Sequence, residues 1–485
     1  MLTREEFDKI YAQGPEACYQ LFQQLFAQIE LLLSQNKQLA ERVQQLEAKQ
    51  AKDSHNSHKP PSTDLHKPKP KSLRKHSSRK QGGQKGHPGH HLALSDSPDH
   101  LQIHSVQHCA SCSVSLSSQE PDLLERRQVF ELPPLRLEVT EHQAEHKICH
   151  SCGYKNIASF PQEISAPVQY GPYLKSFATY LHDYQFVPFD RMSQFFEEVF
   201  HQSLSTGFLV EVEEESFEKL EESEKQIKNR LSEADVLNSD ETGMRFGGKR
   251  NWCHNASTEK LTAYFPHESR GKEAMDAFGI LPNFKGRLIH DHLKAYFLYL
   301  LCKHGLCNVH HLRELVFQEE HHGQKWARKM IDFLLEVNAK VDEERNRSPA
   351  LSKEVLKKYE NRYQKILKEG FQENPLREKV EGKRGRTGQN KGRNLVRRLR
   401  DFKEAVLAFM YDFRVPFGNN QAEQDIRMVK VQQKISGTFR SRRGAERFCR
   451  IRGYISTVHK HGLNILESLR NAFLGNPFIP YANNC

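Results

Sequence analysis

Three carboxylates have the residue type and setting for metal-dependent chemistry. Asp240 and Asp291 stand near the ends of apolar, strand-like stretches, and Glu423 stands in the first turn of a predicted helix. Carboxylate oxygens are the ligands that Mg²⁺ prefers. Two such ions can activate an attacking oxygen and stabilise the leaving oxygen of a phosphodiester. A single aspartate at a strand end is more often a turn residue, but the three in this order predict a catalytic site.

The helix that carries Glu423 also predicts a phosphate-binding face. The pair Asn419-Asn420 follows a Pro-Phe-Gly stop and precedes a run of helix formers, which is typical of a helix start. Cations follow Glu423 on the same helical face, at Arg427, Lys430 and Lys434. Further cations expected on this basic surface are Arg440, Arg442, Arg443, Arg447, Arg450 and Arg452. The alternative is a solvated helix with an ordinary ladder of salt bridges.

The elements that must position these carboxylates are predicted to be mixed α/β. They are strands over 234–243, 251–256 and 260–265, a helix over 272–278, and a strand over 286–291. Asp240 lies near the end of the first strand, and Asp291 ends the last one. A strand, a meander, a helix, a strand and a late helical glutamate follow the element order of a ribonuclease-H-like fold. Glu241 is the rival of Asp240, but neighbouring strand residues face opposite sides, so one of the two is expected to point away.

Two further stretches are predicted to be helical. Residues 170–230 show apolar periodicity followed by many charges. Residues 312–413 have a helical composition and are expected to form an all-α insertion within the catalytic fold. Its basic, glycine-containing break at 381–392 is either a solvated loop or a loop that contacts DNA.

A Cys-x-x-His pair precedes the insertion. Cys307 and His310 make half of a metal site, although simple packing of the cysteine explains it at least as well. Cys302 and His311 would complete the site only if the fold brings them together.

The N-terminal residues carry a heptad pattern. From Cys18 to Leu46, position a holds Phe22, Ile29, Asn36 and Val43, and position d holds Leu25, Leu32, Leu39 and Leu46. Leucine at d predicts a short parallel coiled coil, and asparagine at a favours two strands. The alternative is an amphipathic helix that packs on its own domain.

A basic linker and two cysteine pairs come next. Residues 51–92 are rich in Lys, His, Pro, Ser and Gly, and we expect a flexible arm that contacts DNA through residues such as Lys85. The four thiolates of a structural Zn²⁺ site are predicted at Cys109, Cys112, Cys149 and Cys152. The neighbouring His108 and His150 are substitute ligands, and unrelated free cysteines are the alternative. Alternating residues at 128–132 and 135–139 predict a β-hairpin between the pairs.

The overall composition limits the classes of protein. Net charge is +11, from 72 Lys and Arg against 61 Asp and Glu, and it is concentrated in the linker, which favours a polyanionic partner. No stretch approaches the length of a membrane span, and the N-terminus lacks a secretory h-region. Cysteines in CxxC pairs suit a reducing compartment. The cytoplasm is therefore the expected location.

Several motifs together resemble the transposases of the insertion-sequence-66 family. The matching stretches are 239–243, 288–291, 304–315, 415–423 and 434–441, with the Gly-Gly-Gln of the linker, the paired CxxC knuckles and the N-terminal zipper. The resemblance implies an Asp-Asp-Glu triad at Asp240, Asp291 and Glu423. Two positions depart from the family pattern: His292 stands where the family usually has glycine, and Gly418 where it often has aspartate.

The resemblance implies a DNA transposase of a bacterial insertion sequence. Such an enzyme binds the element ends and catalyses strand cleavage and strand transfer with two Mg²⁺ (or Mn²⁺) ions per active site, besides one structural Zn²⁺. Its expected partners are double-stranded DNA, a second or further copy of the chain, and accessory proteins of the same element, in the cytoplasm at the nucleoid. The alternatives are a decayed transposase that only binds DNA and a stand-alone RNase-H-like nuclease.

The predicted domain order follows from these motifs. It is a coiled coil (1–50), a basic linker (51–92), a zinc module (93–160), a helical connecting or DNA-binding region (161–230), the first part of an RNase-H-like core (231–311), an all-α insertion (312–413), the last part of the core (414–475) and a tail (476–485).

Overall fold

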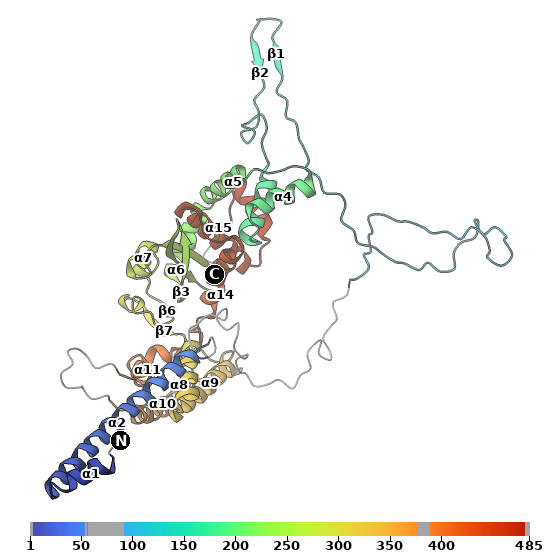
Figure 1. Cartoon of the computed structure of the whole chain (residues 1–485). Coiled ribbons are helices and arrows are strands. Elements are labelled where there is room, and N and C mark those ends of the chain that lie inside the picture. Colours follow the sequence, from blue (N-terminus) through green and yellow to red (C-terminus); the bar gives the residue numbers. More distant parts are fainter. Residues whose placement is uncertain (1–2, 54–55, 57–91, 377–388, 481–485) are drawn as a thin grey trace. The chain divides into compact units, whose positions relative to one another are not determined.

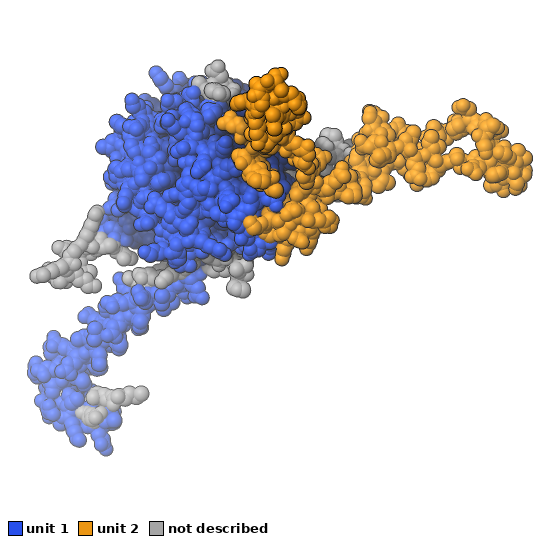
Figure 2. All heavy atoms as spheres, turned by 90° about the horizontal axis from the view of Figure 1, so that it is seen from above, with its two compact units in different colours: residues 1–71, 170–192, 206–485 blue, residues 72–169, 193–205 orange. Residues whose placement is uncertain are grey.

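A computed structural model describes residues 3–53, 56, 92–376 and 389–480. Lys85, nearly all of the predicted linker and most of the basic break at 381–392 lie outside the described residues. The chain divides into two compact units, one of residues 1–71, 170–192 and 206–485, the other of residues 72–169 and 193–205 (Figure 2). Each unit is described by itself.

A mixed five-stranded sheet forms the centre of the first unit (Figure 1). Its strands are β3 (Val236–Phe246), β4 (Lys249–Ser257), β5 (Thr262–His267), β6 (Arg287–His290) and β7 (Lys303–Leu306). In the order β5-β4-β3-β6-β7, the first three strands are antiparallel and β3, β6 and β7 are parallel. The predicted meander and the later strand before Asp291 are therefore confirmed.

The turn between β3 and β4 depends on two glycines. Gly247 and Gly248 have φ angles of 58° and 73°, the left-handed region that a two-residue hairpin turn of this hand requires. Because the turn fixes the register, Asp240 pairs with Asn255 and Glu241 with His254 across the hairpin.

Helices cover both faces of this sheet. The neighbours Ala263 and Tyr264 point to opposite faces and belong to two different apolar clusters. One cluster packs against α6 (Glu221–Glu233) and α7 (Lys272–Phe278), and the other against α14 (Asn420–Ser436) and α15 (Arg442–Lys460). The last helix is α16 (Ile465–Phe473). The sheet is thus buried on both sides, which holds its strand ends in fixed positions.

The region between β7 and α14 is helical, as the sequence predicted. It contains α8 (Asn308–His322), α9 (Lys325–Glu344), α10 (Lys353–Glu373), α11 (Lys391–Asp401), α12 (Lys403–Val406) and α13 (Ala408–Tyr411). Its core is built around the buried side chains of Trp326, Phe333 and Tyr363, and the same cluster continues to Ile289 and Leu306 of the sheet. The helical region therefore packs directly on the edge of the sheet.

The remaining helices of the first unit lie before the sheet in the sequence. They are α1 (Arg4–Tyr11), α2 (Pro15–Gln50), α3 (Pro172–Thr179), the π-helical turn η2 (Tyr180–Tyr184) and α5 (Thr206–Lys219), while α4 (Phe189–Phe200) connects α3 and α5. The predicted N-terminal helix is confirmed, and its apolar side chains, such as Leu32 and Leu39, are more than half exposed. In the described residues, every helix is too short or too polar to cross a membrane.

The described residues of the second unit form a short hairpin, but not the predicted one. Strands β1 (His146–Ile148) and β2 (Lys155–Ile157) pair antiparallel on either side of the second cysteine pair. Residues 128–139 form no strand, so the hairpin predicted there is wrong. Val129 and Val139 are about nine-tenths exposed. An alternating pattern forms a strand only where one face is buried, and this stretch has no such face.

Candidate active site

Two parallel strands bring the predicted aspartates together. Asn238 of β3 pairs with Ile289 of β6, so the residues two positions further on, Asp240 and Asp291, end up beside each other. Ligand oxygens of Asp240, Glu241 and Asp291 all lie within 4.8 Å of one another. The structure therefore forms an all-oxygen cluster of three carboxylates at one end of the parallel strands.

Glu241 belongs to this cluster, against the expectation that one of the two neighbours points away. Its Oε1 accepts a hydrogen bond of 2.8 Å from Arg270 Nε, and its Oε2 accepts one of 2.8 Å from the Tyr296 hydroxyl. The side chain is fully buried. These two donors, which no sequence pattern indicated, hold the carboxylate towards Asp291.

The crowded carboxylates raise the pKa values of Asp240 and Glu241. Burial raises the pKa of Asp240 well above its ordinary value, and the negative charges of Glu241, Asp291 and Glu423 raise it further. The pKa of Glu241 is raised to about 7, mainly by burial and by Asp291. A bound cation relieves such repulsion, so this donor set fits a hard divalent ion.

Asn419 fixes the helix that carries Glu423. The Asn419 side chain donates to the backbone oxygen of Ser239 at 2.8 Å and accepts from the Asn238 amide at 2.9 Å. Instead of capping α14, it ties the helix start to the residues just before Asp240. Glu423 follows one turn later. The sequence marked Asn419 only as a helix-start signal, so this role was missed.

Glu423 lies in a second group of possible ligands. Its carboxylate, the Cys307 thiol and the His310 ring have ligand atoms within 4.8 Å of one another, and His310 Nδ1 is 4.0 Å from Glu423 Oε1. The half-site Cys307-x-x-His310 is thus met by Glu423. Cys302 instead donates to the Tyr299 carbonyl oxygen, and His311 pairs with Asn308.

Comparison with known families agrees with this geometry. The model of the family described as Transposase IS66 family matches residues 167–447, which is more than half of the 485-residue chain. The chain belongs to the IS66 transposase family. A family of unknown function (DUF6444) matches residues 14–93, and no curated protein matches the chain. The three residues of the predicted triad in this IS66 family member lie inside the first match.

The cations on α14 and α15 differ in their surroundings. Arg427, Lys434, Arg440 and Arg442 are exposed. Lys430 is half-buried and donates to the Gly243 carbonyl oxygen, so it ties α14 to β3 in this IS66 transposase. Arg443 pairs with Glu214 and stacks on Phe217, with 3.9 Å between the guanidinium and the ring centre.

Three arginines of α15 do not extend the basic surface, and that prediction is wrong. Arg447 pairs with Glu214 at 3.3 Å, Arg450 pairs with Glu224 at 2.7 Å, and Arg452 is only 6% exposed. The reason lies in the tertiary packing. Glutamates of α5 and α6 neutralise Arg447 and Arg450, and Arg452 donates to the Asp183 carbonyl oxygen of η2.

The four predicted zinc ligands lie in two similar turns, outside the match to the IS66 family. The amide of Ser113 donates to the Cys109 carbonyl oxygen, and the amide of Gly153 donates to that of Cys149. Cys112 and Cys152 are exposed. In the described part of the chain, the groups of ligand atoms within 4.8 Å of one another include none of these cysteines. The zinc site stays a prediction.

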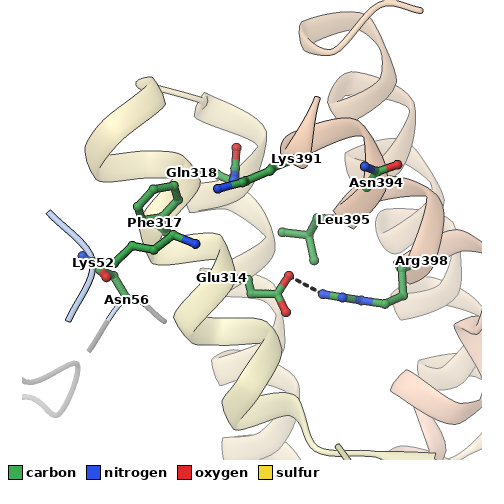
Figure 3. A pocket seen from close by; sticks show the side chains of 9 residues that line it. All are labelled: Lys52, Asn56, Glu314, Phe317, Gln318, Lys391, Asn394, Leu395 and Arg398. Carbon is green, nitrogen blue, oxygen red and sulfur yellow. Dashed lines mark hydrogen bonds and ion pairs between the residues drawn. The ribbon is translucent and has the colours of Figure 1, made fainter. Parts of the chain in front are cut away.

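One pocket lies apart from the carboxylates. It has a volume of about 290 Å³ and is lined mainly by α8 and α11 (Figure 3). Phe317 and Leu395 supply its apolar wall, and an ion pair joins Glu314 to Arg398. None of the three predicted triad residues lines it, so we assign it no part in the predicted chemistry.

Proposed function

We propose that this protein is a DNA transposase that cuts and joins DNA at the ends of a bacterial insertion sequence. Asp240, Asp291 and Glu423 are its catalytic carboxylates. One observation carries the proposal: the neighbouring strands β3 and β6 bring Asp240 and Asp291 within 4.8 Å, and Glu423 is near enough to raise the pKa of Asp240. Three carboxylates that meet from three separate elements repel one another and destabilise the fold unless a cation binds them. The chain also belongs to a transposase family, which supports the same function.

The strand order supports an RNase-H-like core. Three antiparallel strands continue into two parallel ones in the order β5-β4-β3-β6-β7, and the helix with Glu423 packs on β3 and β4. This is the order of elements that places two strand aspartates and one helical glutamate at one end of the sheet. The helical region between β7 and α14 is then an insertion within that core.

Asp240, Asp291 and Glu423 would hold the Mg²⁺ or Mn²⁺ ions. When bound, such ions supply an activated oxygen nucleophile and stabilise the leaving 3′-oxygen. The protein's own contribution is positional. Asn419 fixes the start of α14, and Arg270 with Tyr296 fixes Glu241 next to Asp291, so that the carboxylates need little rearrangement when a metal and DNA arrive.

The exposed cations supply the DNA-binding surface in this proposal. Arg427, Lys434, Arg440 and Arg442 follow Glu423 along α14 and into the start of α15, where they would neutralise phosphates beside the scissile bond. The N-terminal helix pairs two protomers, and the two cysteine pairs bind one structural Zn²⁺. Each of these roles extends the proposal beyond the three carboxylates.

The joining of a pre-cut element end to plasmid DNA tests the proposal. We expect the full chain with Mg²⁺ to join a labelled end and Glu423→Gln to reduce joining at least about 100-fold, because a metal ligand is lost. Glu467→Gln is the matched control, since Glu467 also stands in the first turn of a helix but is about half exposed. It should join like the wild type.

Other outcomes separate the rival functions. Equal joining by wild type and Glu423→Gln would remove Glu423 from the triad. Cleavage of the end without any joining would identify a nuclease. Specific end binding without cleavage or joining, even with the element's accessory proteins present, would identify a DNA-binding remnant.

A further inference from the structure

The turn at Cys307 has the hydrogen bonding of a metal-binding cysteine knuckle. The backbone amides of Val309 and His310, two and three residues further along the chain, act on the Cys307 sulfur and lower the pKa of its thiol, although burial raises that pKa to about 11. A third amide, that of Asn419 from the loop before α14, donates to the same sulfur at 3.2 Å. Such amide donors orient a sulfur and stabilise the negative charge that it carries as a metal ligand.

The two CxxC turns of this chain show the same pattern. Cys109 accepts from the amides of Ser111 and Cys112, and Cys149 accepts from those of Ser151 and Cys152. In all three turns the donors therefore stand two and three residues after the cysteine. The Cys307 turn differs in that its second ligand residue is histidine and that it continues into α8.

Glu423 supplies a third ligand from a different element. Ligand atoms of Cys307, His310 and Glu423 lie within 4.8 Å of one another. Sulfur, nitrogen and oxygen together suit a borderline ion such as Zn²⁺, whereas Mg²⁺ takes oxygen alone. A thiolate and a carboxylate with a neutral imidazole also balance the charge of a divalent ion. This donor set thus differs from the all-oxygen cluster at Asp240.

The backbone is shaped so that the two elements can meet here. A Cβ on Gly418 would lie 2.8 Å from Val309 Cγ2 and 3.7 Å from the Cys307 sulfur, so only glycine lets the loop before α14 approach the turn this closely. The Asn308 amide then donates to the Phe417 carbonyl oxygen at 3.0 Å. This contact accounts for the glycine at position 418.

The three side chains lie just below the surface. Cys307 is buried, and the side chains of His310 and Glu423 are 17% and 23% exposed, although the facing atoms His310 Nδ1 and Glu423 Oε1 are buried. Three protein ligands leave one position of a tetrahedral Zn²⁺ ion for a further ligand.

We propose that Cys307, His310 and Glu423 bind one Zn²⁺-class ion, in addition to the ions at Asp240 and Asp291. On binding, the metal–sulfur bond forms as the thiol proton passes to solvent. The proposal goes beyond the proposed catalysis and does not require it, although the shared Glu423 places the two sites side by side.

Titration of the full-length protein with Co²⁺ tests the site, because thiolate-bound Co²⁺ has a strong near-ultraviolet charge-transfer band. The CxxC pairs contribute to this band, so variants must be compared. We expect Cys307→Ser to bind one Co²⁺ fewer per chain than the wild type and to lose part of the band. Cys302→Ser is the matched control, because Cys302 is a buried thiol five positions away whose hydrogen-bond partner is Tyr299.

His310→Gln guards against a variant that does not fold, since His310 is partly exposed. It should lose the same Co²⁺ equivalent while its circular dichroism stays like that of the wild type. Equal Co²⁺ stoichiometry in the wild type, His310→Gln and Cys302→Ser would overturn the site. This measurement involves no DNA, so its failure is distinguishable from failure of the joining assay with Glu423→Gln.

Discussion

His292, directly after Asp291, adopts a backbone conformation that favours glycine. Its φ angle is 79°, in the left-handed region. The ring packs against Phe297 and Phe402, with ring centres 5.1 Å and 4.7 Å apart. This packing offsets backbone strain, so histidine keeps the turn that carries Asp291.

Glycine and alanine at position 292 separate the strain from the packing. Both substitutions remove the ring, but only alanine keeps the strained φ, so we expect His292→Gly to be more stable than His292→Ala by about 1 kcal/mol. Urea unfolding measures the difference. The matched pair Lys357→Gly and Lys357→Ala, at an exposed position of α10, should show the opposite order. The same order at both positions would contradict the strain at His292.

At the scale of elements, the π-helical turn η2 brings two acids together inside the protein. Asp183 of η2 and Glu213 of α5 are both buried, and His182 lies in the same group. Burial raises the pKa of Asp183 to about 7, against the opposing charges of Arg452 and Arg447 from α15. Two guanidinium groups already supply positive charge here. We therefore expect Asp183 and Glu213 to share a proton, whereas the ligand set at Cys307 is proposed to bind a metal ion.

This pair predicts a pH dependence of stability. The pKa of Asp183 in the folded protein lies above its ordinary value of 3.8. Protonated Asp183 therefore contributes to the free energy of unfolding, and this contribution is complete below the ordinary pKa. The stabilisation is lost as pH rises from about 4 to about 7, at up to about 1.4 kcal/mol per pH unit. In Asp183→Asn this dependence is absent, so its free energy of unfolding relative to the wild type should increase over that range.

Urea unfolding at several pH values measures the change. Asp332→Asn, at a half-exposed aspartate of α9, should leave the pH dependence of the wild type intact. Parallel curves for wild type and Asp183→Asn would mean that Asp183 does not carry the proton.

The predictable elements are those that local patterns define. The meander, the strand before Asp291 and the helix with Glu423 follow from turn residues and periodicity, and the structure contains all of them. The errors around the candidate site concern partners that lie far away in the sequence. A row of arginines in α15 has the spacing of an exposed face, but α5 and α6 cover it. Likewise, no local pattern indicated that Arg270 and Tyr296 would hold Glu241.

At the scale of the whole molecule, α2 leaves an apolar stripe uncovered. The helix has 36 residues, and the heptad positions Leu25, Leu32 and Leu39 are 43%, 54% and 62% exposed. Such a stripe on a helix is costly in water and favours association with a second copy through the same positions. A transposase that must hold two DNA ends together would gain from this pairing.

Charges placed in the stripe test the pairing. We expect the double variant Leu32→Asp with Leu39→Asp to weaken self-association of the full chain at least about 100-fold. Each protomer loses two leucines that the dimer would bury, and the new carboxylates of the two protomers face each other. Ser34→Asp with Gln38→Asp adds the same charge to the opposite face of α2 and should leave association intact. Sedimentation velocity over a range of concentrations measures both. If the variant with aspartate at positions 32 and 39 associates like the control with aspartate at positions 34 and 38, the stripe does not form the dimer interface. In that case α2 packs within its own protomer, and dimers form through another surface.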